Sequence, residues 1–341
     1  MRPSFHPRLV NGPFEDPALF IPFLFEKRAL LFDMGDLHRL PAKEMLKLTH
    51  GFVTHTHMDH FVGFDPLLRT FLGRQKTFHV FGPPDFLQNI EGKLASYTWN
   101  LVENYSHGFS LKATEVHPTR TINQVYDCKN RFKPNRAPKE ANFDGTLLSE
   151  PAFSVHAVHL DHKIPCLGFT LKERFHVNIM KASLKRLKIP VGPWLKRFKE
   201  ALYEEHEPEN QFRVVWTEAE KEHRRTFRLG DLANQIASIS PGQKITYIVD
   251  VLFSPENCER IIDFARNADH LFIEAAFLET EQEIARNKYH LTAKQAGTLA
   301  RKSGAKQYTL FHFSPRYTQA AHMFQEEADR AFMETPGNPD S

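Results

Sequence analysis

Apolar and polar residues along the N-terminal part of the chain follow two patterns. Short apolar runs bounded by turn residues predict strands at Ala18–Glu26, Ala29–Asp33, Gly51–His55 and Thr77–Phe81. The first two runs predict a hairpin. Apolar residues at helical spacing favour a helix over Phe64–Phe71, and Asp85 is expected to cap a second helix that runs to Leu94. Strands and helices therefore alternate from the start of the chain.

Strand and helix patterns return from Phe153 onward and become most regular in the C-terminal third of the chain. Strand patterns recur at Phe153–Leu160, Leu167–Leu171, Lys244–Val249, His270–Ala275 and Gln307–Phe311. Helical patterns cover Pro255–Asn267, Ala293–Ser303 and Thr318–Phe332. Early strands followed by alternating strands and helices predict a layered α/β sandwich. In such folds, sites form where strands end.

The middle of the chain is polar and basic. Cys128–Asn142 contains prolines and cations and predicts an exposed loop. A second basic patch at Lys181–Ala201 is broken by Pro190 and Gly192-Pro193, and a mixed-charge stretch follows it. We interpret 172–228 as an arm inserted into a single domain of 1–341, with 335–341 as a polar tail. A solvated face without a ligand is the alternative for these charges.

Composition narrows the class of protein. The chain has 341 residues, of which 41% are hydrophobic and 25% charged, as in ordinary globular proteins. A net charge of +3 does not by itself indicate nucleic-acid binding. The three cysteines form no CxxC pair, and no segment approaches the roughly 20 apolar residues that cross a bilayer. We expect a cytoplasmic protein that does not bind membranes.

The run His55-Thr-His-Met-Asp-His60 carries the most specific candidate chemistry. Three imidazoles and a carboxylate directly after a strand suit catalytic zinc. An inert histidine-rich loop is the alternative. His162, Asp250 and His312 stand at the ends of later strands. Taken singly each is more often structural, but together with the histidine run they predict a site for two metal ions.

These motifs resemble the successive metal motifs of the metallo-β-lactamase fold. His162 with Gly168-Phe169, and His312-Phe-Ser-Pro-Arg316-Tyr317, are most similar to the ribonuclease Z family, from about Asp33 to Tyr317. The resemblance implies a four-layer αβ/βα sandwich with two zinc ions per subunit, manganese or iron being possible. It implies that one ion is held by His55, His57 and His162, that the other is held by Asp59, His60 and His312, and that Asp250 bridges both.

The resemblance also implies catalytic and substrate-binding residues. His290 corresponds to the family's proton donor, and Asp59 and Glu274 complete the expected catalytic set. RNA is expected to bind to the basic arm and to Arg316. The expected contacts of the arm are Lys185, Arg186, Gly192, Pro193, Lys196 and Arg197. Trp194 could stack on RNA or pack in a core. The chain departs from the family at Ile273, where a histidine is usual, and at Leu9–Asp16, where a glycine-rich segment is usual.

We therefore predict a zinc-dependent endoribonuclease that removes the 3′ trailer of precursor tRNA. The resemblance implies a homodimer in which the arm of one subunit serves the site of the other. The two departures favour an alternative, a two-metal hydrolase of small phosphodiesters, cyclic nucleotides or sulfate esters. A third interpretation, a metal-bound RNA-binding module without catalysis, does not need the open coordination position that this ligand set provides.

Overall fold

The computed structural model describes residues 4–24, 26–134, 136–218 and 220–334, so the predicted polar tail at 335–341 lies outside the described residues. The chain divides into two compact units. Among the described residues, the larger unit contains Phe5–Leu147, Val155–Thr170 and 244–334. The smaller unit contains Ser4, Leu148–Ser154 and Leu171–Gln243.

The first sheet is formed by strands that follow one another in sequence order. In the described part of the chain it comprises β1 (Arg8–Leu9), β2 (Leu19–Pro22), β3 (Ala29–Phe32), β4 (Leu48–Phe52), β5 (Lys76–Gly82), β6 (Phe109–Val116), β7 (Arg120–Asp127) and β8 (Lys139–Asn142). Strands β3 to β6 are parallel. Strands β2 and β3 pair antiparallel, with Leu19 opposite Phe32, which confirms the predicted hairpin.

The second sheet combines strands from the middle and the end of the chain. Its order among the described residues is β18 (Tyr308–Phe311), β17 (His270–Glu274), β16 (Lys244–Ile248), β11 (Pro165–Glu173), β10 (Phe153–Asp161) and β9 (Thr146–Ser149). Strands β16, β17 and β18 are parallel. Their carboxyl ends therefore meet at one edge of the sheet.

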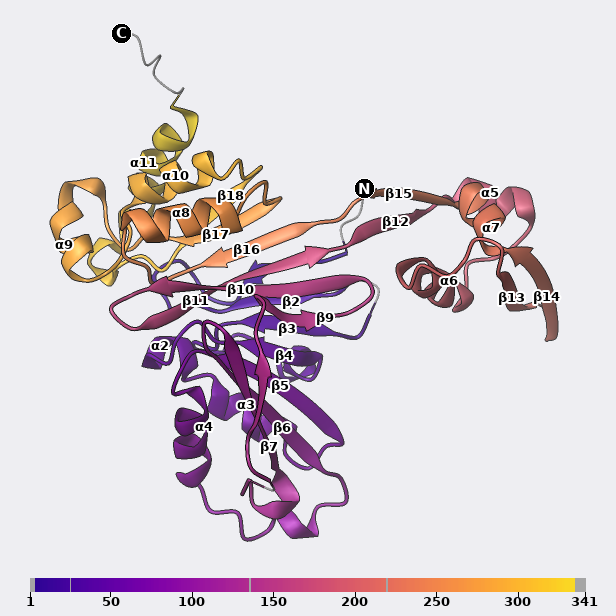
Figure 1. The fold of residues 1–341 in the computed structure, drawn as a ribbon, viewed down its shortest axis with the longest axis horizontal. Coiled ribbons are helices and arrows are strands. Elements are labelled where there is room, and N and C mark those ends of the chain that lie inside the picture. The colour runs from indigo at the N-terminus through magenta and orange to yellow at the C-terminus, as the bar shows by residue number, and fades with distance from the viewer. Residues whose placement is uncertain (1–3, 25, 135, 219, 335–341) are drawn as a thin grey trace. The chain divides into compact units, whose positions relative to one another are not determined.

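Helices cover the outer faces of both sheets (Figure 1). The first sheet carries α1 (Ala42–Met45), α2 (Met58–Phe61), α3 (Phe64–Phe71) and α4 (Phe86–Ala95). The second sheet carries α8 (Pro255–Phe264), α10 (Ala293–Lys302) and α11 (Ala321–Met333), with α9 (Gln282–Asn287) beside Phe277. Single 3₁₀ turns lie at Val102–Asn104, Cys128–Asn130, Glu279–Glu281 and Pro315–Tyr317.

Local sequence explains where these helices form. In α3, Phe64, Leu67, Leu68 and Phe71 are buried at helical spacing. Thr292 caps the N-terminus of α10, and its hydroxyl accepts a hydrogen bond from Gln295 N–H in a reciprocal capping box. None of the helices that the structure describes combines the length and apolar character that a membrane span needs.

Aromatic side chains join the inner faces of the two sheets. The Phe169 ring lies 5.4 Å from Phe32 and 5.7 Å from Phe52, and the Tyr247 ring lies 5.9 Å from Phe32, centre to centre. The larger unit is therefore built of four layers, helix, sheet, sheet and helix. This confirms the predicted layered α/β sandwich.

The smaller unit has a core of its own. It contains the antiparallel pairs β12 (Phe175–Ile179) with β15 (Ala237–Pro241) and β13 (Gln211–Glu218) with β14 (Lys221–Arg228), and the helices α5 (Lys181–Leu187), α6 (Trp194–Tyr203) and α7 (Leu229–Ile236). Trp194 is only 1% exposed, and its indole N–H donates to the carbonyl of Pro190. Of the two interpretations of Trp194, core packing is the correct one.

Some local predictions were wrong. Strand β4 ends at Phe52, so His55 lies beyond the strand. Asp85 precedes α4 but has a left-handed backbone, with φ of 70°, and its side chain does not cap the helix. The segment Cys128–Asn142 is not simply an exposed loop. Cys128 is buried in the core between the first sheet and its helices, and the segment ends in edge strand β8. All four residues of β8 are exposed, which hides it from hydrophobic patterning.

Candidate metal centre

The histidine run bends where a loop meets a helix. After β4, residues 53–57 lead to α2, and His57 is the residue immediately before that helix. His55 and His57 therefore project from the loop, whereas Asp59 and His60 project from the single turn of α2. This bend turns the two halves of the motif toward different neighbours.

Three residues of the site have a left-handed backbone conformation, and each lies just after the end of a strand. The φ angles are 58° at Asp33 after β3, 51° at Asp250 after β16 and 62° at His312 after β18. Residues with a Cβ adopt this region rarely, and aspartate tolerates it better than most. The same abrupt turn at the ends of separate strands brings distant parts of the sequence to one place.

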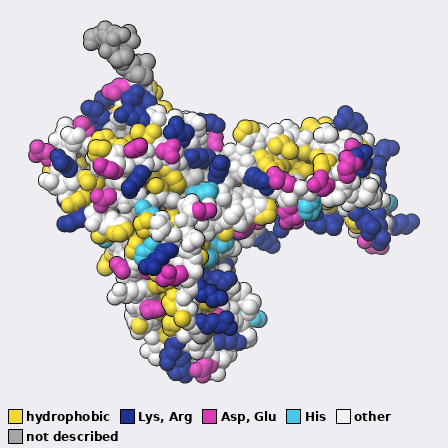
Figure 2. Space-filling model, viewed as in Figure 1, with side chains coloured by type: hydrophobic (Ala, Val, Ile, Leu, Met, Phe, Trp, Pro, Cys, Tyr) yellow, Lys and Arg dark blue, Asp and Glu magenta, His cyan; other side chains and the backbone are white. Residues whose placement is uncertain are grey.

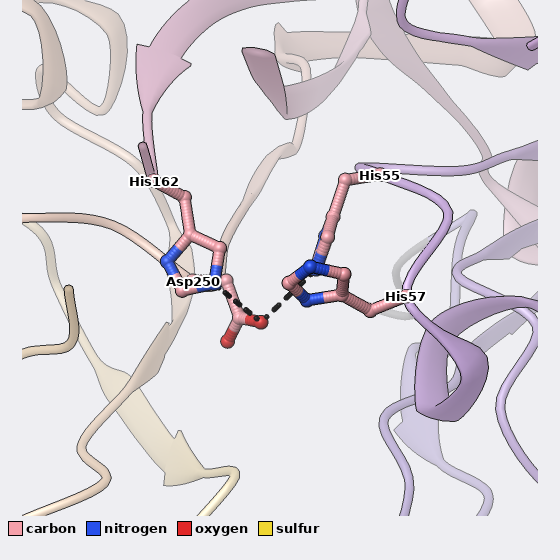
Figure 3. Close-up of side chains that lie close together, drawn as sticks. All are labelled: His55, His57, His162 and Asp250. Atoms are coloured by element: carbon pink, nitrogen blue, oxygen red, sulfur yellow. Dashed lines mark ion pairs between the residues drawn. The ribbon is translucent and has the colours of Figure 1, made fainter. Parts of the chain in front are cut away.

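The first ligand group consists of His55, His57, His162 and Asp250. Their donor atoms all lie within 4.8 Å of one another. His55 Nε2 is 3.2 Å from Asp250 Oδ2, and His162 Nε2 is 3.5 Å from the same oxygen. Figure 3 shows the Asp250 carboxylate between His162 on one side and the pair His55 and His57 on the other.

The second ligand group consists of Asp59, His60 and His312. Asp59 Oδ2 lies 3.2 Å from His312 Nε2 and 3.5 Å from His60 Nε2. Asp250 reaches this group too, because its Oδ2 is 3.1 Å from His60 Nε2 and its Oδ1 is 3.0 Å from His312 Nδ1. The structure thus brings together all seven side chains that the sequence predicts as ligands, with Asp250 between the two groups.

The donor atoms of this site fit divalent cations. His55 Nε2, His60 Nε2, Asp250 Oδ1 and His312 Nδ1 are buried and have no hydrogen-bond partner among the described residues. Most buried polar atoms in proteins are paired, so such a convergence requires an explanation. Imidazole nitrogens and carboxylate oxygens that face one another are the donor set of catalytic zinc.

Electrostatics in the centre support the same interpretation. Burial lowers the pKa of His55 to about 4, which keeps this imidazole neutral and able to donate a lone pair. Burial disfavours charge on His312 as well, but the Asp250 carboxylate outweighs it and raises the pKa of His312 to about 10. The carboxylates therefore demand positive charge, which a metal ion supplies in place of protons.

Asp33 orients one of the ligands from a fully buried position. It accepts hydrogen bonds from Thr54 N–H at 2.7 Å, from Tyr247 O–H at 2.9 Å and from His60 Nδ1–H at 2.9 Å. The last contact leaves His60 Nε2 directed at the site. The sequence interpretation assigned no role to Asp33. The sequence signal that could have identified Asp33 is its position directly after an apolar run, because Asp250 also directly follows an apolar run.

His290 lies beside the ligands and is held by Glu274. Its Nδ1 is 2.9 Å from Glu274 Oε2, and its ring centre is 5.1 Å from that of His162. Glu274 is fully buried, and its other oxygen accepts from Val251 N–H at 2.8 Å. Burial alone would lower the pKa of His290, but the Glu274 carboxylate raises it. The side chain of His290 is 17% exposed, so it remains accessible from solvent.

Ile273 occupies the position where the family usually has a histidine. It is buried in the apolar cluster beneath the outer helices, together with Leu271 and Ile261. Because side chains alternate along a strand, Ile273 faces away from the site that the neighbouring Glu274 enters. The change at this position therefore removes no partner of the ligands described above.

The predicted RNA-binding residues are divided between the two units. In the smaller unit, Lys185, Arg186, Pro193, Lys196 and Arg197 are exposed and Gly192 is partly buried. Figure 2 shows Lys and Arg side chains interspersed with acidic ones over this unit. Arg316 belongs to the larger unit, where its Nη1 is 3.0 Å from Glu281 Oε1 and its guanidinium lies 5.9 Å from the Phe277 ring centre.

Solved structures with a similar fold define the class of protein. No family model matches the chain. The metallo-β-lactamase fold protein YhfI from Bacillus subtilis superposes with a TM-score of 0.55 at 15% identity, over 96% of this chain and 92% of that one. The short form of human tRNase Z gives a TM-score of 0.50 at 17% identity, over 92% and 93%. The fold is that of the metallo-β-lactamase proteins.

Sequence relatives identify the family within this class. The chain is 30% identical to ribonuclease Z of Deinococcus radiodurans, over 92% of this chain and 91% of that protein. It is 28% identical to ribonuclease Z of Limosilactobacillus reuteri, over 89% and 84%. The chain belongs to the ribonuclease Z family. The prediction of a metal-dependent hydrolase of this family is confirmed.

Proposed function

We propose that the chain is an endoribonuclease that removes the 3′ trailer of precursor tRNA. The observation that carries this proposal is the joint arrangement of two ligand groups, shared by Asp250, with the His290–Glu274 pair beside them. Two comparisons support the assignment of precursor tRNA as the substrate. The chain matches proteins named ribonuclease Z over most of their length, and it shares its fold with human tRNase Z.

We assign two zinc ions to the ligand groups. His55, His57 and His162 would hold one ion, Asp59, His60 and His312 would hold the other, and Asp250 would contact both. When bound, such a pair supplies a hydroxide nucleophile near neutral pH and neutralises charge on the phosphodiester. Manganese and iron accept the same donor atoms, so their presence would not change the assignment of residues.

His290 would supply the proton to the leaving group. Its Nδ1 is bonded to Glu274, so its Nε2 is the nitrogen available to substrate. As the P–O3′ bond breaks and hydroxide bonds to phosphorus, Nε2–H would protonate O3′ and leave a 3′-hydroxyl on the tRNA and a 5′-phosphate on the trailer. Glu274 is then a positioning residue. Asp59, whose side chain is 42% exposed, is a ligand that would border the substrate.

The exposed cations of the smaller unit would bind the body of the tRNA, in a homodimer in which each arm serves the partner's site. We also place the protein in the cytoplasm. Its cysteines, Cys128, Cys166 and Cys258, are all free, as is usual in a reducing compartment.

Cleavage of a precursor tRNA by the purified, metal-analysed protein tests the function. The wild type should release the 3′ trailer, and Asp59→Ala should abolish release because a ligand is lost. Asp263→Ala, an exposed carboxylate on α8, serves as the matched control and should cleave normally. Full activity in a metal-free Asp59→Ala protein would contradict the proposal. Rapid hydrolysis of small esters with an uncut precursor would instead select the small-ester hydrolase.

A further inference from the structure

Two lysines that the sequence interpretation did not assign lie close to the metal centre. Lys163 follows the ligand His162 in the turn between β10 and β11, and its Nζ is 5.6 Å from the ring centre of Tyr289. Lys288 follows α9, and its Nζ is 6.0 Å from the ring centre of Phe277. In both contacts an ammonium group lies against an aromatic ring.

The two aromatic residues connect these lysines to the imidazoles of the site. The Tyr289 ring centre is 6.3 Å from that of His162, and the Tyr289 carbonyl accepts a hydrogen bond from His162 Nδ1–H at 2.8 Å. The Phe277 ring centre is 6.1 Å from that of His290. Each ammonium group is thus one aromatic ring away from a functional imidazole.

The charges of both lysines are left without a counterion. Lys163 and Lys288 are exposed, and among the described residues neither ammonium group lies within 4.0 Å of a carboxylate. Other lysines of the larger unit do pair with acids, such as Lys93 with Asp65 and Lys306 with Asp269. Arg316, at the same Phe277 ring, is also paired, with Glu281. Unpaired cations at the border of a site are free to bind an anion.

We propose that Lys163 and Lys288 bind the backbone phosphate of the nucleotide on the 5′ side of the cut. This inference rests on the proposed function and defines how the same site holds its substrate. His290 protonates O3′ of that nucleotide. The nucleotide's own 5′-phosphate is the next phosphate toward the 5′ end from the scissile one, and it therefore lies on the His290 side of the centre. Both lysines lie on that side, through Tyr289 and Phe277.

A cycle of protein and substrate changes tests this contact. Lys163→Met and Lys288→Met remove the charge and keep most of the side-chain length. The precursor tRNA carries either its natural phosphate or one neutral methylphosphonate at the position 5′ of the cut. With the natural phosphate, each substitution should lower kcat/KM about tenfold, as expected for loss of a charge-assisted contact. With the methylphosphonate, the substitutions should have no further effect, because the contact is already absent.

Three controls separate the possible results. Lys302→Met, an exposed lysine in the last turn of α10, should leave both substrates unaffected. Bound metal should be unchanged in both lysine variants, and so should the rate on bis(p-nitrophenyl) phosphate, which has a single phosphorus. Additive effects of protein and substrate changes would overturn this contact alone, while an unreactive precursor with wild type would overturn the proposed function and the contact with it.

Discussion

The strand ends of the larger unit and the basic surface of the smaller unit are organised in opposite ways. In the metal centre, His55, His60 and Asp250 present buried atoms that have no hydrogen-bond partner among the described residues. On the basic surface of the smaller unit the predicted RNA-binding cations are exposed, and Lys196 is already paired with Glu200 at 3.7 Å. Buried donors require a ligand, whereas exposed pairs contribute little energy.

This difference indicates how function is distributed over the protein. A single substitution in the centre disturbs a contact that water cannot replace, so its effect should be large. A single substitution on the basic surface leaves its neighbours to compensate, so its effect should be small and dependent on salt.

Removal of the proton donor should have the largest effect short of losing a ligand. His290→Ala should reduce kcat for precursor tRNA by roughly 10²- to 10⁴-fold, the usual contribution of a positioned general acid. KM should change little, because the variant retains every metal ligand and every cation of the surface. Single-turnover cleavage rates with saturating enzyme measure this loss directly.

Metal content distinguishes catalysis from structure in this variant. Because His290 bonds to Glu274 and is not one of the seven predicted ligands, His290→Ala should keep the wild-type metal content by elemental analysis. His322→Ala changes an exposed histidine on α11 and should cleave normally. A His290→Ala protein that lost its metal would show that this residue acts as a ligand and not as an acid.

Changing Asp33, which orients the ligand His60, should have an intermediate effect on metal binding. Asp33→Asn keeps the size of the side chain but replaces one acceptor oxygen, which faces His60 and Tyr247, by an N–H donor. We expect metal affinity to fall roughly 10- to 100-fold. Competition with a chromophoric chelator measures the affinity, and Asp263→Asn on the surface of α8 is the matched control. An unchanged affinity would mean that His60 is oriented without Asp33.

The ligands were predictable because each stands at a recognisable place in the sequence. The histidine run follows an apolar segment, and Asp250 and His312 directly end apolar runs that became β16 and β18. The supporting contacts were not predictable from such patterns. Asp33 bonds to Tyr247, 214 residues away in the sequence, and His162 bonds to the carbonyl of Tyr289. These contacts exist only once the two sheets face each other.

The fold could be predicted where one face of each element is apolar, as in α3 and the C-terminal strands. Strand β14 was missed because most of its side chains are exposed and charged. Its partner β13 carries Phe212, Val214 and Trp216 on one face, a period of two that would have revealed the hairpin. Exposed, charged residues therefore do not rule out a strand, but they remove the alternation of apolar and polar residues by which a strand is recognised in the sequence.

The basic surface of the smaller unit should give the smallest effect per residue. Combined substitution of four exposed cations by alanine should raise Kd for precursor tRNA on the order of tenfold and lower the salt dependence of binding by up to roughly 3 to 4 in logarithmic slope, since each phosphate contact contributes about 0.9. The four residues are Lys185, Arg186, Lys196 and Arg197. Binding isotherms at several salt concentrations measure both quantities.

A matched set on the larger unit separates local contacts from net charge. Both variants lose four positive charges, so a general loss of attraction would weaken RNA binding equally in the two. If the arm contacts the RNA, the control set should keep nearly the wild-type salt slope, and both variants should hydrolyse a small phosphodiester at the wild-type rate. Equal slopes would instead assign recognition to the centre and its bordering lysines. The control residues are Lys43, Arg69, Lys129 and Lys302.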